Sequence, residues 1–508
     1  MNLLSSTSVF SFYTLISRLL GYARDILIAI FLGASIYADA FFVAFRIPNT
    51  FRRLFAEGTF NSAFIPSYTN EKKKSSKNGK IFADEVLGLL ILVLFFIVVL
   101  VEIFTPYLVY IIAPGFFEEK DKFSLAVEFT RITFPFLIFV SLASFFSGIL
   151  NANNKFAAAA AAPIILNIIL ILSLFISYLL NLNFAKNLSY GVTLAGIIQL
   201  IFLFFFTLKF YKPSLYFKTK ISKKVNIFLK KLLPSIFSSG VTQINILIGT
   251  IIASFETSAV SYLYYADRVY QINLAIAGIA IGTVSLPVLS KAIQDKNSSL
   301  ISRIQNKSIE LSFLLSIPAS LGLIIGSSEI VNALFGYGSF SEENILMTSE
   351  ALKFFGYGVP AFALIKILSN LFFSRSNTIT PFKISVFIVL INILISLSLF
   401  KSIGFIIIPI ATSISTWLGV IVYFILLKKN KSLFINKILL KNILKIVFSA
   451  ILMASVLLLG LDVFQEDLDY ANKFKSIYLL FIVSFVATIY LISCYLLGVL
   501  KIKNYKIK

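Results

Sequence analysis

Long apolar runs recur along the whole chain and are separated by short polar segments. A helix needs about 20 apolar residues to cross the hydrocarbon core of a bilayer, and runs of this kind follow one another from end to end. The pattern predicts about fourteen membrane spans, near residues 6–33, 37–66, 82–112, 124–150, 157–180, 188–210, 226–254, 259–290, 308–335, 346–373, 381–400, 404–427, 438–460 and 475–499. The fold class that follows is an all-α polytopic membrane protein.

The polar segments between these spans alternate in charge. Lysines gather in four of them, at 71–80, 208–231, 427–441 and 501–508. Segments on the alternate side are neutral or acidic, at 115–122, 339–344 and 461–470. Because Lys and Arg collect on the cytoplasmic side of membrane proteins, we expect both termini to be cytoplasmic.

Composition supports the membrane class. Hydrophobic residues make up 58% of the 508 residues, charged residues 13%, and the mean hydropathy is +0.92. A soluble protein needs a far more polar surface. The net charge of +22 comes largely from lysines in the short polar segments, and this placement argues against nucleic-acid binding.

Residue types that often carry chemistry are scarce. Histidine is absent and Cys494 is the one cysteine, so the commonest general base and metal ligand are missing. We therefore expect no enzyme, no cofactor and no bound metal. The first residues, MNLLSSTSVFSF, lack the basic segment and cleavage site of a signal peptide, so we expect them to be retained.

A weak internal repeat relates the first six spans to the next six. Four residue pairs recur at nearly one offset: Arg46 and Arg268 at 222, Pro66 and Pro287 at 221, Pro135 and Pro360 at 225, and Pro163 and Pro381 at 218. Six spans per half give both halves one orientation, and parallel repeats of this kind place a substrate site between them. The sequence therefore predicts two parallel six-helix lobes, an N-lobe at 1–212 and a C-lobe at 213–432.

The last two spans lie outside the repeat, in a C-terminal helix pair at 433–508. Their apolar cores carry no charge. Two interpretations remain open at this point: a hairpin that stabilises the fold or joins two copies, and a hydrophobic groove for a long lipid tail.

Charges inside apolar sequence are concentrated between Ser17 and Pro66. They are Arg18, Arg24, Asp25, Asp39, Arg46, Arg52, Arg53 and Glu57. Charges within a span are costly and usually face a bundle interior or a water-filled path. This stretch is therefore predicted to form one wall of a cationic cavity inside the membrane.

Helical spacing gathers these residues into two polar stripes. The first span carries Ser17, Arg18, Gly21, Arg24 and Asp25, and the second carries Asp39, Arg46, Asn49, Arg53 and Glu57 with Arg52 beside them. Gly21 weakens its helix and is expected to allow a bend. Pro48 removes a backbone donor and is expected to kink the second span.

Arginine is used selectively. Nine of the 45 basic residues are Arg, and five of the nine precede residue 54. Arg presents a flat, permanently charged fork that grips phosphate in two places, which Lys does not. The alternative is that these arginines pair with the acids of the same stretch, or that Arg52 and Arg53 extend to the cytoplasmic interface.

The charge balance favours an anionic ligand. Five arginines accompany three acids in the first two spans, and Asp267 and Arg268 stand at the matching place of the second half. An excess of cation within the membrane predicts an anion from outside, with phosphate or pyrophosphate the best fit to arginine pairs. Lys366, inside the tenth span, is a further candidate for contact with substrate or an ion.

The motifs SRLLGYARD, GASIYADAFFVAFRIPN and FRRLFAEGTFNSAFIP resemble the MurJ (MviN) family of bacterial lipid II flippases, in the MOP exporter superfamily. The YYADR run ending at Arg268, APGF at 113–116 and FSRSNTITP at 373–381 extend the resemblance over essentially the full chain. It implies two six-helix lobes with two extra C-terminal helices that form a lipid-tail groove. It also implies export of lipid II, the undecaprenyl-pyrophosphate-linked disaccharide-pentapeptide, across the bacterial inner membrane for peptidoglycan synthesis.

The resemblance also implies functional residues. The family's cavity arginines correspond to Arg18, Arg24, Arg52 and Arg268, and its cavity acid to Asp39. These residues would bind the pyrophosphate during alternating access, with Asp39 setting arginine geometry or acting in gating. We expect supporting or gating roles for Ser17, Gly21, Asp25, Arg46, Asn49, Arg53, Glu57 and Asp267. Expected partners are lipid II, membrane lipids and cell-wall synthesis proteins, without nucleic acid.

One departure concerns energy coupling. Some relatives bind sodium through acids in the seventh and eleventh spans, but neither 226–254 nor 381–400 contains a carboxylate. Sodium coupling by that route is therefore not expected.

Other functions remain open. The chain could transport another lipid-linked oligosaccharide, or export drugs on the same scaffold, although a drug exporter should prefer an acidic cavity. A scaffold that anchors cell-wall enzymes without transport is the alternative from a different class. It predicts that conservative changes of the buried charges leave function intact.

Overall fold

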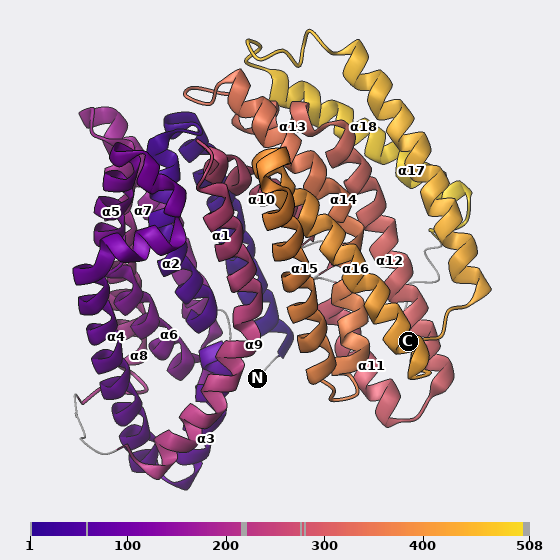
Figure 1. Ribbon diagram of the computed structural model, residues 1–508. Coiled ribbons are helices and arrows are strands. Elements are labelled where there is room, and N and C mark those ends of the chain that lie inside the picture. Colours follow the sequence, from indigo (N-terminus) through magenta and orange to yellow (C-terminus); the bar gives the residue numbers. More distant parts are fainter. Residues whose placement is uncertain (1–2, 57–58, 215–220, 275–276, 279–280, 501–508) are drawn as a thin grey trace. The chain divides into compact units, whose positions relative to one another are not determined.

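The computed structural model describes residues 3–56, 59–214, 221–274, 277–278 and 281–500, and their side chains except at 3–10, 51, 53–56, 59, 233–239 and 241–242. The described residues are almost entirely helical, and no β-strand occurs among them (Figure 1). The chain divides into two compact units, residues 1–261 and 262–508. The division falls inside α10 (Ala259–Leu274). The lobe boundaries expected at 212/213 and 432/433 stay predictions.

Among the described residues, nine α-helices precede α10. They are α1 (Leu3–Leu32), α2 (Ile36–Ala56), α3 (Thr59–Lys74), α4 (Ser76–Ile112), α5 (Lys120–Thr133), α6 (Phe136–Ala152), α7 (Phe156–Leu180), α8 (Phe184–Thr207) and α9 (Lys223–Ala253), with the short 3₁₀-helix η1 (Pro114–Glu118) before α5.

The second unit continues from α10. Its further helices are α11 (Ile281–Gln294), α12 (Ser298–Ile325), α13 (Ser327–Phe335), α14 (Glu342–Phe373), α15 (Ile379–Ile403), α16 (Ile407–Lys429), α17 (Lys437–Val463) and α18 (Lys475–Leu496), with the 3₁₀-helix η3 (Gly404–Ile406) before α16.

Every predicted span overlaps a described helix. Two spans each contain two helices that separate at described residues, α5 with α6 and α12 with α13. The spans at 37–66 and 259–290 include residues outside the described ranges, which lie between α2 and α3 and between α10 and α11. The break between α5 and α6 falls at Pro135, which has no N–H to continue the helical ladder. Pro48 lies inside α2 and does not end it.

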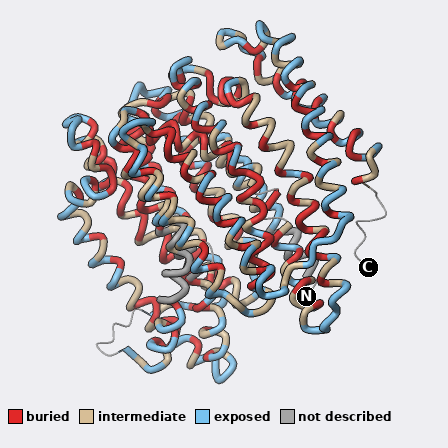
Figure 2. Tube along the Cα trace, turned by 45° about the vertical axis from the view of Figure 1, so that its right-hand side comes forward, coloured by how far each residue is buried: buried red, intermediate tan, exposed pale blue. Residues whose placement is uncertain are grey.

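The described residues contain nine helical stretches that are long and apolar enough to cross a membrane. In each unit the buried positions lie on the sides of helices that face other helices, while exposed positions follow the outer sides (Figure 2). The protein is therefore a multi-pass membrane protein of the expected all-α class. The exact number of fourteen spans stays a prediction.

An aromatic cluster holds the first unit together and includes α9. Phe64 of α3 stacks near Phe82 of α4 and Phe145 of α6, and Phe228 of α9 meets Phe64 and Phe82 edge-on. Aromatic pairs of this geometry add to the gain from burying their area. The helix α9 is thereby part of the first unit.

A salt-bridge cluster joins α9 to α3 at their polar ends. Glu71 Oε2 lies 2.8 Å from Lys224 Nζ, and Glu71 Oε1 lies 2.5 Å from Lys74 Nζ. The bond from Lys224, followed by that from Lys74, holds the pKa of Glu71 below its usual range.

The internal repeat reappears in the local geometry of each unit. Asn154 after α6 and Ser376 after α14 both adopt a left-handed backbone, with φ of 60° and 59°, and stand 222 positions apart. In each case that residue and the next donate backbone hydrogen bonds to the carbonyls three and five positions back, respectively. The two helices therefore end in the same turn.

A second likeness concerns one asparagine and one glycine at a helix crossing. A Cβ placed on Gly148 of α6 would lie 2.7 Å from Asn61 Oδ1 of α3. In the other unit, Asn370 Nδ2 of α14 donates to the carbonyl of Gly282 in α11 at 2.6 Å. The positions correspond at offsets of 221 and 222, but the two residue types have changed places.

The hairpin of α17 and α18 packs along α12 and α13 within the second unit (Figure 1). Tyr490 of α18 donates from its hydroxyl to the carbonyl of Leu314 at 2.7 Å. At the other end, Lys475 Nζ donates to the carbonyls of Gly336 and Tyr470, at 2.5 and 2.7 Å. These contacts attach both ends of α18 to the rest of the unit; the groove for a lipid tail stays a prediction.

Candidate functional site

Arg24 is buried in α1 and makes three hydrogen bonds to two polar partners. Its Nε and Nη2 donate to Asp25 Oδ1 at 3.0 and 2.6 Å, and its Nη1 donates to Asn167 Oδ1 of α7 at 2.9 Å. Arg24 is 5% exposed and Asp25 2%. The structure thus brings together two residues of the predicted stripe. Arg24 pairs with an acid of the same stretch, which was the alternative to binding a phosphate.

Asn167 also holds the backbone of α1. Its Nδ2 donates to the carbonyl of Ser17 at 2.8 Å. A Cβ on Gly21 would lie 3.5 Å from the Asn167 amide, an ordinary van der Waals contact, so this amide packs beside Gly21. The helix α1 runs through Gly21 as one element. Arg18, on the same stripe, is exposed.

The stripe on α2 is only partly described. Arg52 donates from Nε to Asn49 Oδ1 at 3.0 Å, and Arg46 is partly buried. The side chain of Arg53 and all of Glu57 lie outside the described residues. Arg52 is therefore positioned by a neighbour one turn away on its own helix.

Arg268 lies in the second unit and is described there by itself. Its Nη2 donates to the hydroxyl of Tyr264 at 2.9 Å, and its guanidinium carbon lies 4.9 Å from the centroid of that ring. The neighbouring Asp267 accepts a hydrogen bond from Gln271 Nε2. Arg268 thus presents a charge oriented by an aromatic ring one turn earlier.

Lys366 of α14 lies beside a glycine of the same unit. Its side chain is exposed, and a Cβ on Gly278 would lie 3.6 Å from its Cγ. The role considered for Lys366 stays a prediction.

Asp39 is fully buried and lies in a charge cluster that sequence reasoning did not anticipate. Its Oδ2 lies 2.9 Å from Lys122 Nζ of α5. Its Oδ1 accepts from the backbone N and the hydroxyl of Ser261, at 2.9 and 2.5 Å. Asp39 and Lys122 are 0% and 1% exposed. We call Asp39, Lys122 and Ser261 the latch; the described partners of Asp39 are these residues rather than an arginine.

The latch joins three elements of the first unit. Asp39 lies in the first turn of α2, Lys122 in the first turn of α5, and Ser261 in the first turn of α10. The Ser261 N–H is one of the helix-terminal donors that lack a partner within the helix, and a carboxylate is favourable there. Asp39 therefore caps α10 from a different helix.

Further contacts surround the latch. Lys122 Nζ lies 4.3 Å from the ring centroid of Phe116 in η1, which adds a cation–π contact. Ser258 Oγ donates to the carbonyl of Ala34 at 2.9 Å, and Gly115 N donates to Ser254 Oγ at 3.0 Å. The turn between α9 and α10 is thereby held by both the turn that precedes α2 and η1.

Gly115 is predicted to be required for this packing. A Cβ there would lie 2.3 Å from the carbonyl oxygen of Ser254 and 2.5 Å from Phe255 Cα. Because both are backbone atoms, Gly115→Ala should displace η1 and lower the free energy of unfolding by about 1–3 kcal/mol. Thermal unfolding of the purified protein measures this effect.

Gly322→Ala is the matched control for that measurement. A Cβ on Gly322 of α12 meets nothing within 4 Å, and alanine is the better helix former, so stability should hold or rise. Equal melting temperatures for Gly115→Ala and the native chain would contradict the close approach of η1 to residues 254–255.

Only weak signals in the sequence pointed to the residues that complete the two clusters. Asn167 follows Pro163 by four positions inside an apolar run, and Lys122 closes the acidic segment 115–122. Asn167 is a polar amide in a membrane span, which marks it as a candidate. Nothing local marked Lys122 as the partner of Asp39, because 83 positions separate them in the chain.

Buried ion pairs and amides inside long apolar helices are typical of multi-pass membrane proteins in which polar side chains serve a function. An inward-facing multidrug resistance MATE family transporter of the MOP superfamily matches with a TM-score of 0.65, covering 82% of this chain and 94% of that one. At 15% identity, this likeness shows the fold alone.

The chain belongs to the MurJ family. The family model described as lipid II flippase MurJ matches residues 28–480. A probable lipid II flippase MurJ of Rickettsia prowazekii is 40% identical over 423 residues, 82% of each chain. One from Buchnera aphidicola (subspecies Baizongia pistaciae) is 34% identical over 515 residues, the full length of both. A solved lipid II flippase MurJ in an inward closed conformation matches with a TM-score of 0.81 at 28% identity, covering 96% of this chain and 98% of that one.

Proposed function

We propose that this protein is a lipid II flippase that carries the lipid-linked peptidoglycan precursor across the bacterial inner membrane by alternating access. The observation that carries the proposal is family membership over nearly the whole chain, together with the likeness to a MurJ structure of the inward closed conformation. The protein is thus a transporter, and we infer no catalytic step.

The arginines suit the anionic part of this substrate. A guanidinium has five N–H donors, and Arg24 uses three of them on Asp25 and Asn167. Asp25 and Asn167 fix the plane of the Arg24 guanidinium, and its two other N–H donors remain for phosphate oxygens. We propose that Arg24 binds the pyrophosphate together with Arg18, Arg52 and Arg268, in a conformation that uncovers Arg24.

The latch supplies a reason for gating by Asp39. A transporter needs contacts that hold one conformation and release in the next, and a ligand drives only the change that it binds differentially. Asp39 fixes the first turn of α10, the helix that also carries Arg268. We propose that the latch holds one state of the cycle and opens in another.

We further propose that both termini lie in the cytoplasm. The alternation of lysine-rich and acidic segments supports this orientation. It places the latch, which adjoins the acidic segment 115–122, toward the periplasm. Cell-wall synthesis proteins stay candidate partners.

Complementation of a bacterium depleted of its own MurJ tests the function. The native chain should restore growth and rod shape, whereas the empty vector should not. Lack of rescue despite normal abundance in the membrane would contradict lipid II transport and favour another lipid-linked oligosaccharide. Rescue that survives loss of every arginine named above would favour a scaffold without transport.

A further inference from the structure

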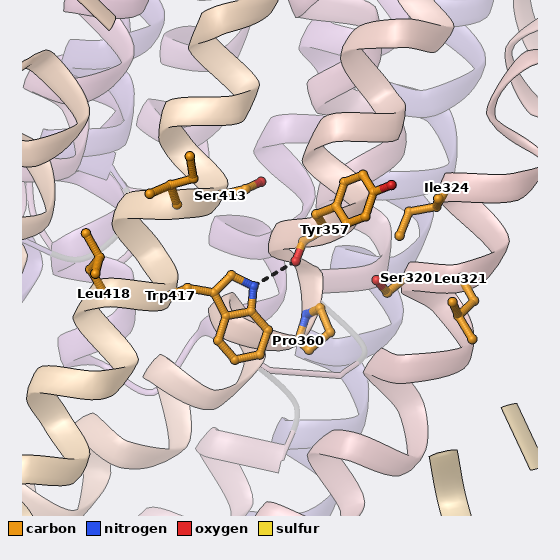
Figure 3. Close-up of a pocket in the computed structure, with 9 residues that line it drawn as sticks. Ser320, Leu321, Ile324, Tyr357, Pro360, Ser413, Trp417 and Leu418 are labelled. Carbon is orange, nitrogen blue, oxygen red and sulfur yellow. Dashed lines mark hydrogen bonds between the residues drawn. The ribbon is translucent and has the colours of Figure 1, made fainter. Parts of the chain in front are cut away.

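A recess of about 570 Å³ opens on the second unit between α12, α14 and α16 (Figure 3). This volume lies within the range of roughly 300–1,000 Å³ that is usual for small-molecule sites. Its lining residues are Ser320, Leu321, Ile324, Tyr357, Pro360, Ser413, Ile414, Trp417 and Leu418.

Pro360 lies inside α14 and lines the recess, and side chains of the neighbouring helices donate hydrogen bonds to carbonyls of α14 there. Proline has no N–H for the carbonyl four positions earlier, here Gly356, and Ser320 Oγ of α12 donates to that carbonyl at 2.8 Å. Trp417 Nε1 of α16 donates to the carbonyl of Tyr357 at 2.9 Å, as the dashed line in Figure 3 shows.

A second serine of the wall is satisfied in the same way. Ser413 Oγ donates to the carbonyl of Phe354 at 2.7 Å. The two serine hydroxyls and the indole N–H are therefore all occupied by carbonyls of α14. The hydroxyl of Tyr357 is the other polar side-chain group of the lining, so a ligand in the recess meets a largely apolar surface, which disfavours a strongly polar ligand.

The recess lies at hydrocarbon depth and continues into the apolar outer surface of the unit. Trp417 is the eleventh of 23 residues in α16, and Tyr357 is the sixteenth of 32 in α14. Exposed apolar residues continue along α16 on the same face: Ile414, Leu418, Ile421 and Ile425. In a membrane-spanning helix this face contacts lipid, so the recess is an extension of the protein–bilayer interface.

We propose that the recess binds one acyl chain of a membrane phospholipid. The largely apolar lining, the occupied serine and indole donors and the opening onto the lipid-facing surface all match a hydrocarbon chain. The bound chain packs against Pro360 of α14 and Trp417 of α16. This site is separate from the arginines assigned to the substrate.

Trp417 makes the proposal directly testable because it is the one tryptophan of the chain. The full-length protein is reconstituted in phosphatidylcholine and phosphatidylglycerol vesicles that contain a rising fraction of phosphatidylglycerol brominated in mid-chain. Bromine quenches tryptophan on contact. A binding site predicts quenching that saturates at a low fraction of brominated lipid, whereas quenching in simple proportion to that fraction would overturn the proposal.

Three variants test whether the brominated chain that quenches Trp417 lies in the recess. Leu321→Phe and Ile324→Phe each extend a ring into it from α12 and should remove the saturating component. Ile425→Phe, two turns beyond Trp417 on the exposed face, should leave it unchanged. Saturation retained in both folded α12 variants, or abolished by added undecaprenyl phosphate, would overturn the assignment to a phospholipid chain.

Discussion

Replacing Lys122 with methionine is expected to lower the free energy of unfolding by about 3–5 kcal/mol, the usual cost of removing one member of a buried ion pair. Asp39 would remain fully buried with its Oδ2 unpaired, since Lys122 Nζ is its charged partner at 2.9 Å. Thermal or denaturant unfolding of the purified protein, followed by helix content, measures the loss.

Two comparisons show whether the loss arises from the buried charge. Lys186→Met removes a lysine that pairs with Glu128 on the exposed surface and should change stability little. The double variant Lys122→Met, Asp39→Asn leaves no buried charge in the latch. The amide oxygen at position 39 still accepts a hydrogen bond from Ser261, so this variant should regain most of the lost stability. A single Lys122→Met variant as stable as the native protein would refute the latch.

Arg24→Ala is expected to abolish complementation in the MurJ-depleted strain. The substitution removes a proposed pyrophosphate ligand and also the guanidinium that bonds to Asp25, an acid buried at 2% exposure. Loss of the substrate contact and loss of stability would both lower rescue, so the alanine variant alone does not separate substrate binding from folding. Growth and the abundance of the protein in the membrane are measured together.

Arg24→Lys separates the two effects. Lysine keeps the positive charge beside Asp25. It lacks the planar guanidinium, whose separate N–H groups can bond to Asn167 and to a phosphate at the same time. We expect a stable, abundant protein with a marked loss of rescue. Arg303→Ala, an exposed arginine near the start of α12, should rescue fully. Full rescue by Arg24→Lys would contradict a role for the Arg24 guanidinium in binding pyrophosphate and would leave it only the role of pairing with Asp25.

Much of the fold followed from the apolar pattern. The membrane class depends on the length of apolar runs, which is a local property of the sequence, and each predicted span overlaps a described helix. The breaks were harder to predict because proline has opposite effects in different places. Pro135 separates α5 from α6, whereas Pro48 and Pro360 lie inside continuous helices.

The candidate site was less predictable, because its contacts join distant parts of the chain. Helical spacing correctly grouped Arg24 with Asp25 on α1, but Asn167 enters from α7 and needs the packing of the two helices. Asp39 looked like a member of the arginine stripe, yet its described partners come from α5 and the start of α10. A polar stripe on one helix therefore identifies buried charged residues, but it does not identify the residues of other helices that contact them.

The exchange of asparagine and glycine between the two helix crossings bears on how the repeat arose. Such a crossing pairs one amide with one glycine, and either helix can supply either one. After duplication of an ancestral half, a copy with glycine on both helices loses the amide but adds no clash, so single changes through that copy connect Asn61 with Gly148 to Gly282 with Asn370. The two halves thus differ in which helix carries the amide, yet they keep the same helix-ending turn.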